Sequence, residues 1–514
     1  MKRTVLRSGV VWTPLGDCTA LCVEGERVAW VGDERGAEHF ADNADSVVDL
    51  AGRFVGPAFV DAHVHAAQTG LSAASLDLRS TSSCAQALAA LEAYAGGVDG
   101  QLVLGFGWDE TRWPEQRPFT GEEVDRAVGG KTAYLARIDV HSAVLSSAFT
   151  DQAPHVRAAD GWQRDGRVER TAHHLARQLV NELVSPGQRR DAIGTALQAA
   201  AGAGIGAIHE IGAPHLSRTE DFAAIAELGA ERPGPSVVRY WGELGAVDTA
   251  RELGCRGAAG DLCVDGAFGS RTAALTSPYA DADTSGYLYL DVAEIRDHVV
   301  ACTNAGLQAG FHCIGDRAVG VTLDGFVQAA SIVGVPALRA ARHRLEHVEL
   351  IDAAGIETLA RLGVTASVQP AFDAAWGGSS DMYAARLGAE RAASTNPFRS
   401  LADAGVDLAF GSDTPVTALD PWGSVRAAAW HRTPRFRLTP AEAFGAHTRG
   451  GWRAGGVDDA GALVPGAPAT YAVWDVPGGF AAGLPDLDPA LPLPQCVSTV
   501  VEGAVVYERE GALA

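Results

Sequence analysis

The chain has 514 residues, of which 47% are hydrophobic, and its formal net charge at pH 7 is −22. This length allows a large barrel together with a smaller domain, and the ordinary hydrophobic content indicates a globular protein. The negative charge argues against nucleic acid as a partner, because phosphate binding needs a basic surface.

The sequence also argues against a membrane protein. The first residues, MKRTVLRSGVVWTPLGDC, are basic, but Pro14, Gly16 and Asp17 interrupt their apolar run. No stretch of about 18 uninterrupted apolar residues follows. The eight cysteines form no CxxC pair, which is typical of reduced thiols. We therefore expect a cytoplasmic protein that acts on a small molecule and has no nucleic-acid or membrane partner; a homodimer is left open.

Both ends of the chain predict short strands. Residues 1 to about 56 contain VLRSGVVWT, TALCVEGERVAWVG and SVVDLAGRFVGP, where valines alternate with polar residues. The stretches ATYAVWDV and CVSTVVEGAVVYERE near the C-terminus have the same pattern. Neither end is large enough to bury a core alone. We therefore predict one composite β-sandwich built from residues 1–56 and 455–514.

Residues 57–454 alternate between predicted strands and helices, which is typical of an α/β protein with a (β/α)8 TIM barrel. The expected strands are residues 58–65, 204–210, 236–243, 261–266, 307–313, 343–350, 364–370 and 406–413. Helix signals follow several of them. Asp352 and Gly363 are expected to cap one helix, and Thr439 with Glu442 forms the capping-box pattern of another.

The connection between the first and second expected strands is far longer than usual. It spans about 140 residues and contains the strand-like stretches QLVLGFGW and TAYLARIDVHSAVL, with a predicted helix at 188–202. We therefore expect an inserted subdomain at about residues 66–187, which covers the mouth of the barrel as a lid.

Two histidines end the first expected barrel strand, in GPAFVDAHVH. Residues i and i+2 of a strand point to the same side, so His63 and His65 point into the barrel together with Asp61. Active sites of such barrels lie at the carboxyl ends of the strands. The pattern alone is weak, because a pair of histidines can also be structural and hydrogen-bonded.

Three later strand ends add His312 in GFHCIGD, His347 in RLEHVEL and Asp413 in AFGSDTPV. Imidazoles and a carboxylate suit a borderline divalent ion such as zinc. Core packing explains the set poorly, because proteins rarely bury charged groups without a partner. The combined set predicts a metal site.

The chain resembles the metal-dependent amidohydrolase superfamily, and more closely its YtcJ-like (amidohydrolase-3) branch, which includes N-substituted formamide deformylases. The matching stretches are GPAFVDAHVH, LCVDGAFGSRTAAL, FHCIGDRA, RHRLEHVEL, ASVQP, GSDTPV with PWGSV, LTPAEAF and GALVPGAPATYAVWDV. They are specific as an ordered set that covers nearly the whole chain. The resemblance implies the barrel and composite sandwich that the strand pattern already predicts.

The resemblance also implies roles for individual residues. It makes His63, His65, His312, His347 and Asp413 the metal ligands, with Asp413 also the catalytic proton shuttle. A hydroxide formed on the metal would attack a carbonyl, and Asp413 would deliver the proton to the leaving nitrogen. The implied activity is hydrolysis of non-peptide carbon–nitrogen bonds in small amides, N-formyl compounds, cyclic amides or ureido compounds. A deaminase and a catalytically silent binding or regulatory protein are the alternatives.

One residue departs from the branch. Many members have a lysine where this chain has Asp261, and carboxylation of that lysine lets it bridge two metals. Asp261 opens the expected strand DLCVDG, so we expect its carboxylate to lie too deep to reach such a position, and Lys131 is no evident substitute. Three outcomes stay open: one ion, two ions bridged by water or by Asp265 or Glu210, or weakened metal binding. We favour one divalent ion, zinc.

Four residues are candidates for substrate binding. Trp108 in GFGWDE and His141 in RIDVHSAVL resemble motifs of the branch and are expected to line the pocket from above. Arg271 could hold a substrate carboxylate or carbonyl, and Asp265 is the fourth candidate. Core packing is the alternative for Trp108, and a surface salt bridge is the alternative for Arg271.

Overall fold

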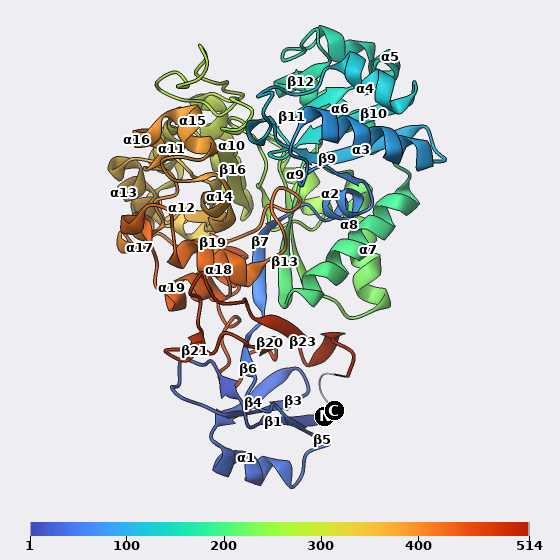
Figure 1. Ribbon diagram of the computed structural model, residues 1–514. Coiled ribbons are helices and arrows are strands. Elements are labelled where there is room, and N and C mark those ends of the chain that lie inside the picture. The colour runs from blue at the N-terminus through green and yellow to red at the C-terminus, as the bar shows by residue number, and fades with distance from the viewer. Residues whose placement is uncertain (1, 512–514) are drawn as a thin grey trace.

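Eight parallel strands form the barrel at the centre of the computed structural model, which describes residues 2–511 (Figure 1). In chain order they are β7 (Phe59–Val64), β13 (Ile205–Gly212), β14 (Ser236–Trp241), β15 (Gly257–Ala258), β16 (Gln308–Cys313), β17 (Arg344–His347), β18 (Thr365–Val368) and β19 (Leu408–Phe410). The barrel closes where the chain beyond β19 meets β7: Asp413 N donates to His63 O at 2.9 Å. The predicted TIM barrel is confirmed.

Helices lie between and after these strands, most of them on the outside of the barrel. They are α7 (Pro186–Gly202), α8 (Thr219–Glu231), α9 (Val247–Glu252), α10 (Val292–Ala305), α11 (Asp316–Val333), α12 (Val335–Ala341), α13 (Ala353–Leu362), α14 (Pro370–Trp376), α15 (Met382–Leu387), α16 (Ala389–Ala392), α17 (Phe398–Asp403), α18 (Pro421–Ala429), α19 (Pro440–Ala446) and α20 (Arg449–Ala454). The predicted caps are confirmed: Asp352 accepts from Gly355 N, Gly363 ends α13 with a φ of 68°, and Thr439 and Glu442 form the capping box of α19.

The fourth barrel strand differs from the prediction. Residues 261–266 form no regular strand; β15 ends earlier, at Ala258, and only a single bridge links Cys263 to His312. Gly260 has a φ of +96°, a conformation that other residues rarely adopt, and a Cβ there would lie 2.6 Å from Ile211. The chain therefore turns after Ala258, and residues 261–266 lie beyond the carboxyl end of the strand.

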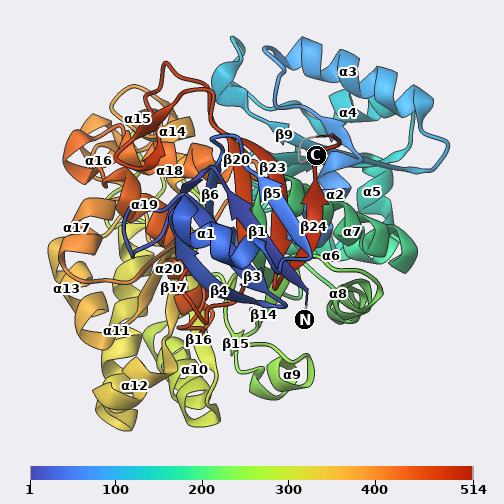
Figure 2. The ribbon, with the colours of Figure 1, turned by 90° about the horizontal axis from the view of Figure 1, so that it is seen from below.

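Both termini contribute to a sandwich of two sheets below the barrel (Figures 1 and 2). One sheet contains β4 (Arg27–Gly32), β3 (Ala20–Glu24), β1 (Arg3–Arg7) and β5 (Ser46–Asp49), with α1 (Glu34–Ala41) against it. The other contains β2 (Val10–Val11), β6 (Phe54–Pro57), β20 (Tyr471–Asp475), β23 (Gln495–Val501) and β24 (Ala504–Glu508). Leu21, Val55, Val473 and Val497 pack between the sheets. The composite sandwich is confirmed, and its boundaries at residues 56 and 455 stay a prediction.

The long connection after β7 folds into a separate five-stranded sheet, at the end of the barrel remote from the sandwich (Figure 1). Its strands are β8 (Leu76–Asp77), β9 (Leu102–Trp108), β10 (Thr132–Arg137), β11 (Ser142–Leu145) and β12 (Arg167–Glu169). Its helices are α2 (Ala66–Ala73), α3 (Cys84–Gly97), α4 (Gly121–Val128), α5 (Ser147–Gln152) and α6 (Arg170–Leu183). Tyr134 of this sheet shares an apolar cluster with Phe268 and Ile314 of the barrel loops. The 66–187 boundaries and the lid function stay predictions.

Among residues 2–511 no single helix has sufficient length and apolar character to span a membrane. Within this range, α11 and α12 are long and apolar enough only when taken together, and they are bent by 115° relative to each other.

Candidate metal centre

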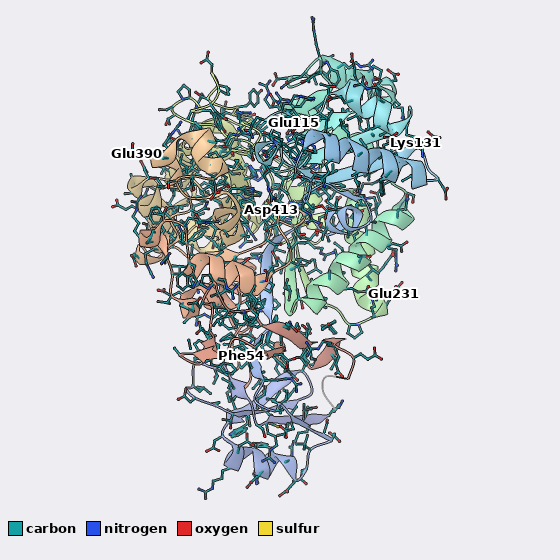
Figure 3. The ribbon with its side chains drawn as sticks, viewed as in Figure 1. Phe54, Glu115, Lys131, Glu231, Glu390 and Asp413 are labelled. Atoms are coloured by element: carbon teal, nitrogen blue, oxygen red, sulfur yellow. The ribbon has the colours of Figure 1, made fainter. Side chains whose placement is uncertain are left out.

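His63, at the end of β7, and His65, directly after it, face two carboxylates at the mouth of the barrel. His63 Nε2 lies 3.4 Å from Asp261 Oδ1 and 3.5 Å from Asp413 Oδ1. His65 Nε2 lies 3.3 Å from Asp261 Oδ2 and 3.1 Å from Asp413 Oδ1. Asp413 lies near the middle of the molecule (Figure 3). The four side chains meet at the carboxyl ends of the strands, where barrel enzymes place their chemistry.

His312 and His347 complete the cluster from β16 and β17. His312 Nδ1 lies 3.6 Å and His347 Nε2 lies 3.9 Å from the same oxygen, Asp261 Oδ1. His347 has a φ of 69°, which breaks the alternation of β17 at its last residue. The structure therefore brings together all five residues predicted as ligands.

The carboxylate of Asp261 does not lie where the sequence predicted. It was expected to lie too deep in the barrel, but it lies among the four imidazoles. The reason is the early end of β15: the turn at Gly260 puts Asp261 at the mouth rather than in the strand. Asp261 is therefore a sixth candidate ligand, which the sequence analysis did not include because it placed residue 261 at the start of a strand.

The buried polar atoms of the cluster fit a metal ion. His63 Nε2, His312 Nδ1, His347 Nε2 and Asp261 Oδ1 are buried and have no hydrogen-bond partner within residues 2–511. Folded proteins rarely leave such atoms unsatisfied. The three nitrogens lie 3.4, 3.6 and 3.9 Å from the Asp261 oxygen, and nitrogens with a carboxylate oxygen are a donor set that suits a borderline divalent cation. The residues present therefore fit the metal implied by the sequence.

The second nitrogen of each imidazole is held by an acceptor. His63 Nδ1 donates to Glu346 Oε2 at 2.9 Å, His65 Nδ1 donates to Ile211 O at 2.8 Å, and His347 Nδ1 donates to Gln369 Oε1 at 2.8 Å. His312 is turned the other way, with Nε2 3.2 Å from Gly266 O. These contacts place the proton on the outer nitrogen and direct the lone pair of the inner nitrogen to the centre, which is how proteins orient metal-binding histidines.

A buried ion pair lies beneath the histidines inside the barrel. Arg344 Nε donates to Glu346 Oε1 at 2.5 Å, and Arg344 Nη1 lies 2.8 Å from His209 Nδ1. Burial alone would raise the pKa of Glu346, but the Arg344 cation and His63 lower it to about 2. Glu346 is therefore ionised and holds His63 in place. Glu210 instead accepts from Ala66 N at 2.9 Å and does not join the cluster.

The electrostatics of the centre favour positive charge. Burial disfavours protonation of both imidazoles on β7, but the Asp261 and Asp413 carboxylates outweigh this effect. They raise the pKa of His65 to about 9 and hold the pKa of His63 well above its usual value. The same carboxylates would stabilise a divalent cation at the inner nitrogens in place of these protons.

A small aromatic cavity opens directly onto the cluster. Its lining includes His141, His312, His347, Asp413, Asp139, Glu349, Phe268, Phe372, Trp376 and Tyr383. The His141 ring lies 4.9 Å from the His312 ring, so the inserted subdomain reaches the centre as the sequence predicted. Burial lowers the pKa of His141 well below its usual value, so its imidazole is neutral. The substrate contact itself stays a prediction.

The other three candidate substrate residues are not part of the lining of this cavity. Trp108 is 1% exposed, donates from Nε1 to Leu135 O at 2.8 Å, and packs in the core of the inserted subdomain. Arg271 forms an ion pair with Asp281 at 2.8 Å, outside the aromatic cavity. Asp265 is fully buried, and its oxygens accept from three backbone N–H groups. These contacts match the structural alternatives for Trp108 and Arg271, and the substrate contacts of all three residues stay predictions.

Lys131 cannot replace the lysine of the branch. It lies at the outer edge of the inserted subdomain, far from Asp413 (Figure 3). Its ammonium donates to Ala95 O at 2.8 Å and to Val98 O at 2.5 Å. The carboxylates that face His63 Nε2 at the centre belong to Asp261 and Asp413.

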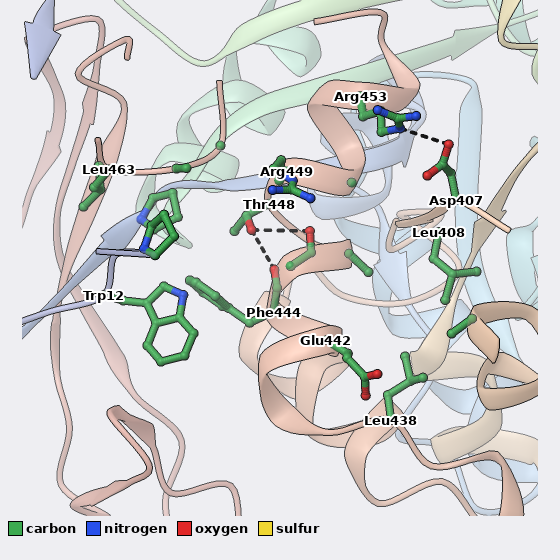
Figure 4. Close-up of a pocket in the computed structure, with 18 of the residues that line it drawn as sticks. Trp12, Asp407, Leu408, Leu438, Glu442, Phe444, Thr448, Arg449, Arg453 and Leu463 are labelled. Atoms are coloured by element: carbon green, nitrogen blue, oxygen red, sulfur yellow. Dashed lines mark hydrogen bonds and ion pairs between the residues drawn. The ribbon is translucent and has the colours of Figure 1, made fainter. Parts of the chain in front are cut away.

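A second cavity, of about 440 Å³, lies at the opposite end of the barrel, next to the sandwich (Figure 4). Trp12, Phe444 and Leu463 contribute apolar walls, and Arg453 pairs with Asp407 at 2.9 Å. Asp407 directly precedes β19, so this cavity is at the amino ends of the strands. Barrel enzymes use that end for stability rather than for chemistry.

Sequence reasoning missed Glu349 in the lining of the aromatic cavity, whereas Asp139, from the same RIDVHSAVL stretch as His141, was expected to line the pocket from above. Glu349 lies two residues beyond β17, and its carboxylate accepts hydrogen bonds from Tyr383 Oη and Asn396 Nδ2. Because β17 ends in the candidate ligand His347, the position of Glu349 directly beyond this strand could have identified it from the sequence.

Comparisons with known proteins agree with this geometry. The putative amidohydrolase YtcJ of Bacillus subtilis is 26% identical over 99% of this chain and 100% of its own length. The N-substituted formamide deformylase of Arthrobacter pascens is 23% identical over 96% of this chain and 95% of its own. The crystal structure of an uncharacterized metal-dependent hydrolase from Pyrococcus furiosus superimposes with a TM-score of 0.71 and 28% identity, over 92% of this chain and 98% of that chain.

The family comparison covers almost the whole sequence. Residues 46–507 match the model of the amidohydrolase family, from the sandwich strand β5 through the barrel to β24. The match includes every side chain of the candidate metal centre. The chain therefore belongs to the amidohydrolase family and is a hydrolase of YtcJ-like type.

Proposed function

We propose that this hydrolase uses one zinc ion to cleave a non-peptide carbon–nitrogen bond in a small amide. The observation that carries the proposal is the convergence of unpartnered buried atoms from His63, His312, His347 and Asp261. His65 and Asp413 complete the proposed ligand set. Two groups of three potential ligands lie in the cluster, and they share His63, which favours a single ion between them.

Asp413 is the proposed proton shuttle. When bound, the metal would polarise the carbonyl and acidify a water molecule. Asp413 contacts His65 and also lines the aromatic cavity, so its carboxylate can reach both the ligands and a substrate. It would take the proton of the attacking water and deliver it to the nitrogen as the carbon–nitrogen bond breaks. The neutral His141 would donate a hydrogen bond that orients the substrate.

The aromatic cavity supports an amide with an apolar substituent. Phe268, Phe372, Trp376 and Tyr383 surround the space next to the cluster and would exclude water from a bound substituent. One relative is named an N-substituted formamide deformylase, and this name supports N-formyl compounds among small, cyclic and ureido amides. We therefore place aromatic N-formyl amines first in the substrate class.

The test combines elemental analysis of the purified protein with a hydrolysis panel. N-formyl amines, cyclic amides and ureido compounds should be cleaved by the zinc-loaded enzyme. Asp413→Ala should lower kcat by about 10²–10⁴-fold, the usual contribution of general acid–base catalysis. Turnover of purines or pyrimidines instead would identify a deaminase. A zinc-loaded protein that is inactive on the whole panel would contradict the proposal.

We also propose a cytoplasmic location. All eight cysteines lie within the described residues and are free thiols, which suits a reducing compartment. The strong negative charge supports a small-molecule substrate rather than a nucleic acid. A homodimer stays a prediction that the oligomeric state in solution tests.

A further inference from the structure

A second group of metal-binding side chains lies beside the candidate metal centre. It consists of His174 from α6, His215 from the loop after β13, and Cys263 from the segment after β15. One ligand atom from each lies within 4.8 Å of the other two. None of the three belongs to the ligand set proposed above, and three separate elements supply them.

The two imidazoles of this group have free ring nitrogens. The His174 ring stacks on the His215 ring with 4.2 Å between centroids and on the Tyr289 ring with 5.2 Å. Within the described part of the chain, no hydrogen bond occupies a ring nitrogen of either histidine. Burial lowers the pKa of His174 to about 3 and that of His215 well below its usual value. Both imidazoles are therefore neutral, the form that binds metals.

We propose that His174, His215 and Cys263 form a second metal site, specific for a thiophilic ion such as zinc. Two imidazoles and one thiolate are a typical zinc donor set, and softer than the histidine and carboxylate set of the first centre. Cys263 releases its proton to solvent when the metal–sulfur bond forms. Three protein ligands leave the fourth tetrahedral position open to water or to a polar group of the substrate.

The two sites share one short segment of chain. Cys263 lies two residues after Asp261, and its sulfur is 3.6 Å from the Asp261 backbone oxygen. Cys263 also forms a β-bridge with His312, which belongs to the first centre. An ion on Cys263 therefore restrains the segment that carries Asp261. Because His174 lies on α6, the same ion connects the inserted subdomain to the barrel.

Cobalt provides a direct test, because a thiolate ligand gives Co²⁺ a strong near-ultraviolet charge-transfer band that imidazole and carboxylate ligands do not give. Cys263 is the only thiol in either proposed site. The cobalt-loaded wild-type protein should show this band and hold two equivalents of metal. Cys263→Ser should lose the band and one equivalent while still binding one ion at the first centre, which also shows that the variant is folded.

Two control variants make the assignment specific. Cys255→Ser removes another buried thiol and should keep the band and both equivalents. His63→Asn should weaken the first centre and keep the band, so the second site can be observed when the first, and with it the proposed hydrolysis, has failed. His174→Ala should weaken cobalt binding at the second site by at least ~10-fold.

Three results would overturn the second site. The first is a wild-type protein that holds one equivalent of cobalt and shows no thiolate band. The second is a band that survives in Cys263→Ser, which would place the thiolate ligand elsewhere. The third is a band that disappears in His63→Asn while a single weakened equivalent remains, which would make Cys263 a ligand of the first centre.

Discussion

Asp261 occupies the centre of the histidine cluster because of where one strand ends. Its Oδ1 atom lies 3.4 Å from His63 Nε2 and 3.6 Å from His312 Nδ1, so it lies close to candidate ligands from two separate strands. A carboxylate in this position can neutralise a cation that imidazoles alone would leave fully charged. Asp261 therefore supplies negative charge at the centre of the cluster without a lysine.

Asp261→Asn tests this role. The substitution keeps the shape of the side chain and removes its negative charge, so zinc affinity at the first centre should fall by at least ~100-fold. Competition with a chelator, followed by elemental analysis, measures the effect. Asp283→Asn changes an exposed aspartate and should leave the affinity unchanged. Equal affinities for both variants would remove Asp261 from the ligand set.

The buried carboxyl of Glu210 should make the free energy of unfolding depend on pH. Burial raises the pKa of its carboxyl to about 7 in the folded protein, above the unfolded value. The folded state therefore holds the proton more tightly, and its stability falls as the pH rises from about 4.3 to 7. At 1.36 kcal/mol per pKa unit, the loss approaches about 3–4 kcal/mol above pH 7.

Glu210→Gln removes this dependence while its amide oxygen can still accept from Ala66 N. Urea unfolding at pH 5 and pH 8 compares the two proteins. The variant should be more stable relative to wild type at pH 8 than at pH 5. If the two unfolding free energies change in parallel with pH, Glu210 has an ordinary pKa.

At the scale of elements, the two-residue strand β15 determines the geometry of the site. β15 pairs with β14 and β16 through Gly257 and Ala258 and then ends. The turn at Gly260 follows at once, with a φ of +96°. A strand that began at Asp261, as the sequence predicted, would instead place this carboxylate at the deep end of the barrel. The early position of β15 in the sequence therefore places both proposed metal sites at the mouth.

Gly260→Ala tests the turn. An alanine there adopts an unfavourable φ and also places its Cβ 2.6 Å from Ile211, so the free energy of unfolding should fall by about 2–4 kcal/mol. Zinc affinity should fall as well, because the turn positions Asp261. Urea unfolding and chelator competition measure the two effects.

Gly245→Ala is the matched control. Gly245 has a φ of +74°, and a Cβ there would have no atom within 4 Å. Only the backbone strain remains, about 1–2 kcal/mol, with no change in zinc affinity. If the two variants behave alike, the close approach of Gly260 to Ile211 has no importance for the site.

At the scale of the whole molecule, the sandwich closes the lower end of the barrel. Phe54 of β6 and Trp474 of β20 belong to the same apolar cluster as Phe59 and Trp422 of the barrel. Phe59 contacts the rings of Trp422 and Trp474 at 5.1 and 5.7 Å. The barrel therefore depends on strands from both ends of the chain for part of its core.

Truncation after Ala454 should consequently prevent folding of the barrel. It removes β20 and β23, leaves β6 without its antiparallel partner and exposes Phe59. The truncated chain should be largely insoluble or lack a cooperative unfolding transition in circular dichroism. Truncation after Arg509, which keeps every strand of the sandwich, should behave as the full chain does. A soluble, zinc-binding 1–454 fragment would contradict this dependence.

Several local patterns were sufficient to predict the architecture. Alternating valines predicted the sandwich strands, and Asp352 and Thr439 predicted helix starts. The ends of the expected strands predicted that five side chains lie together at the mouth of the barrel, namely those of His63, His65, His312, His347 and Asp413. These predictions succeed because periodicity and capping act between residues close in the chain. The carboxyl ends of parallel strands then meet at one end of any such barrel.

The sequence by itself determined the fold class and the meeting of the five candidate ligands at one end of the barrel, because both follow from local patterns repeated along the chain. Tertiary structure alone decided the position of Asp261, the burial of Trp108 and the meeting of His174, His215 and Cys263. Each of these depends on where a strand ends or on how the inserted subdomain packs on the barrel. Such contacts join residues tens to hundreds of positions apart, and no local periodicity specifies them.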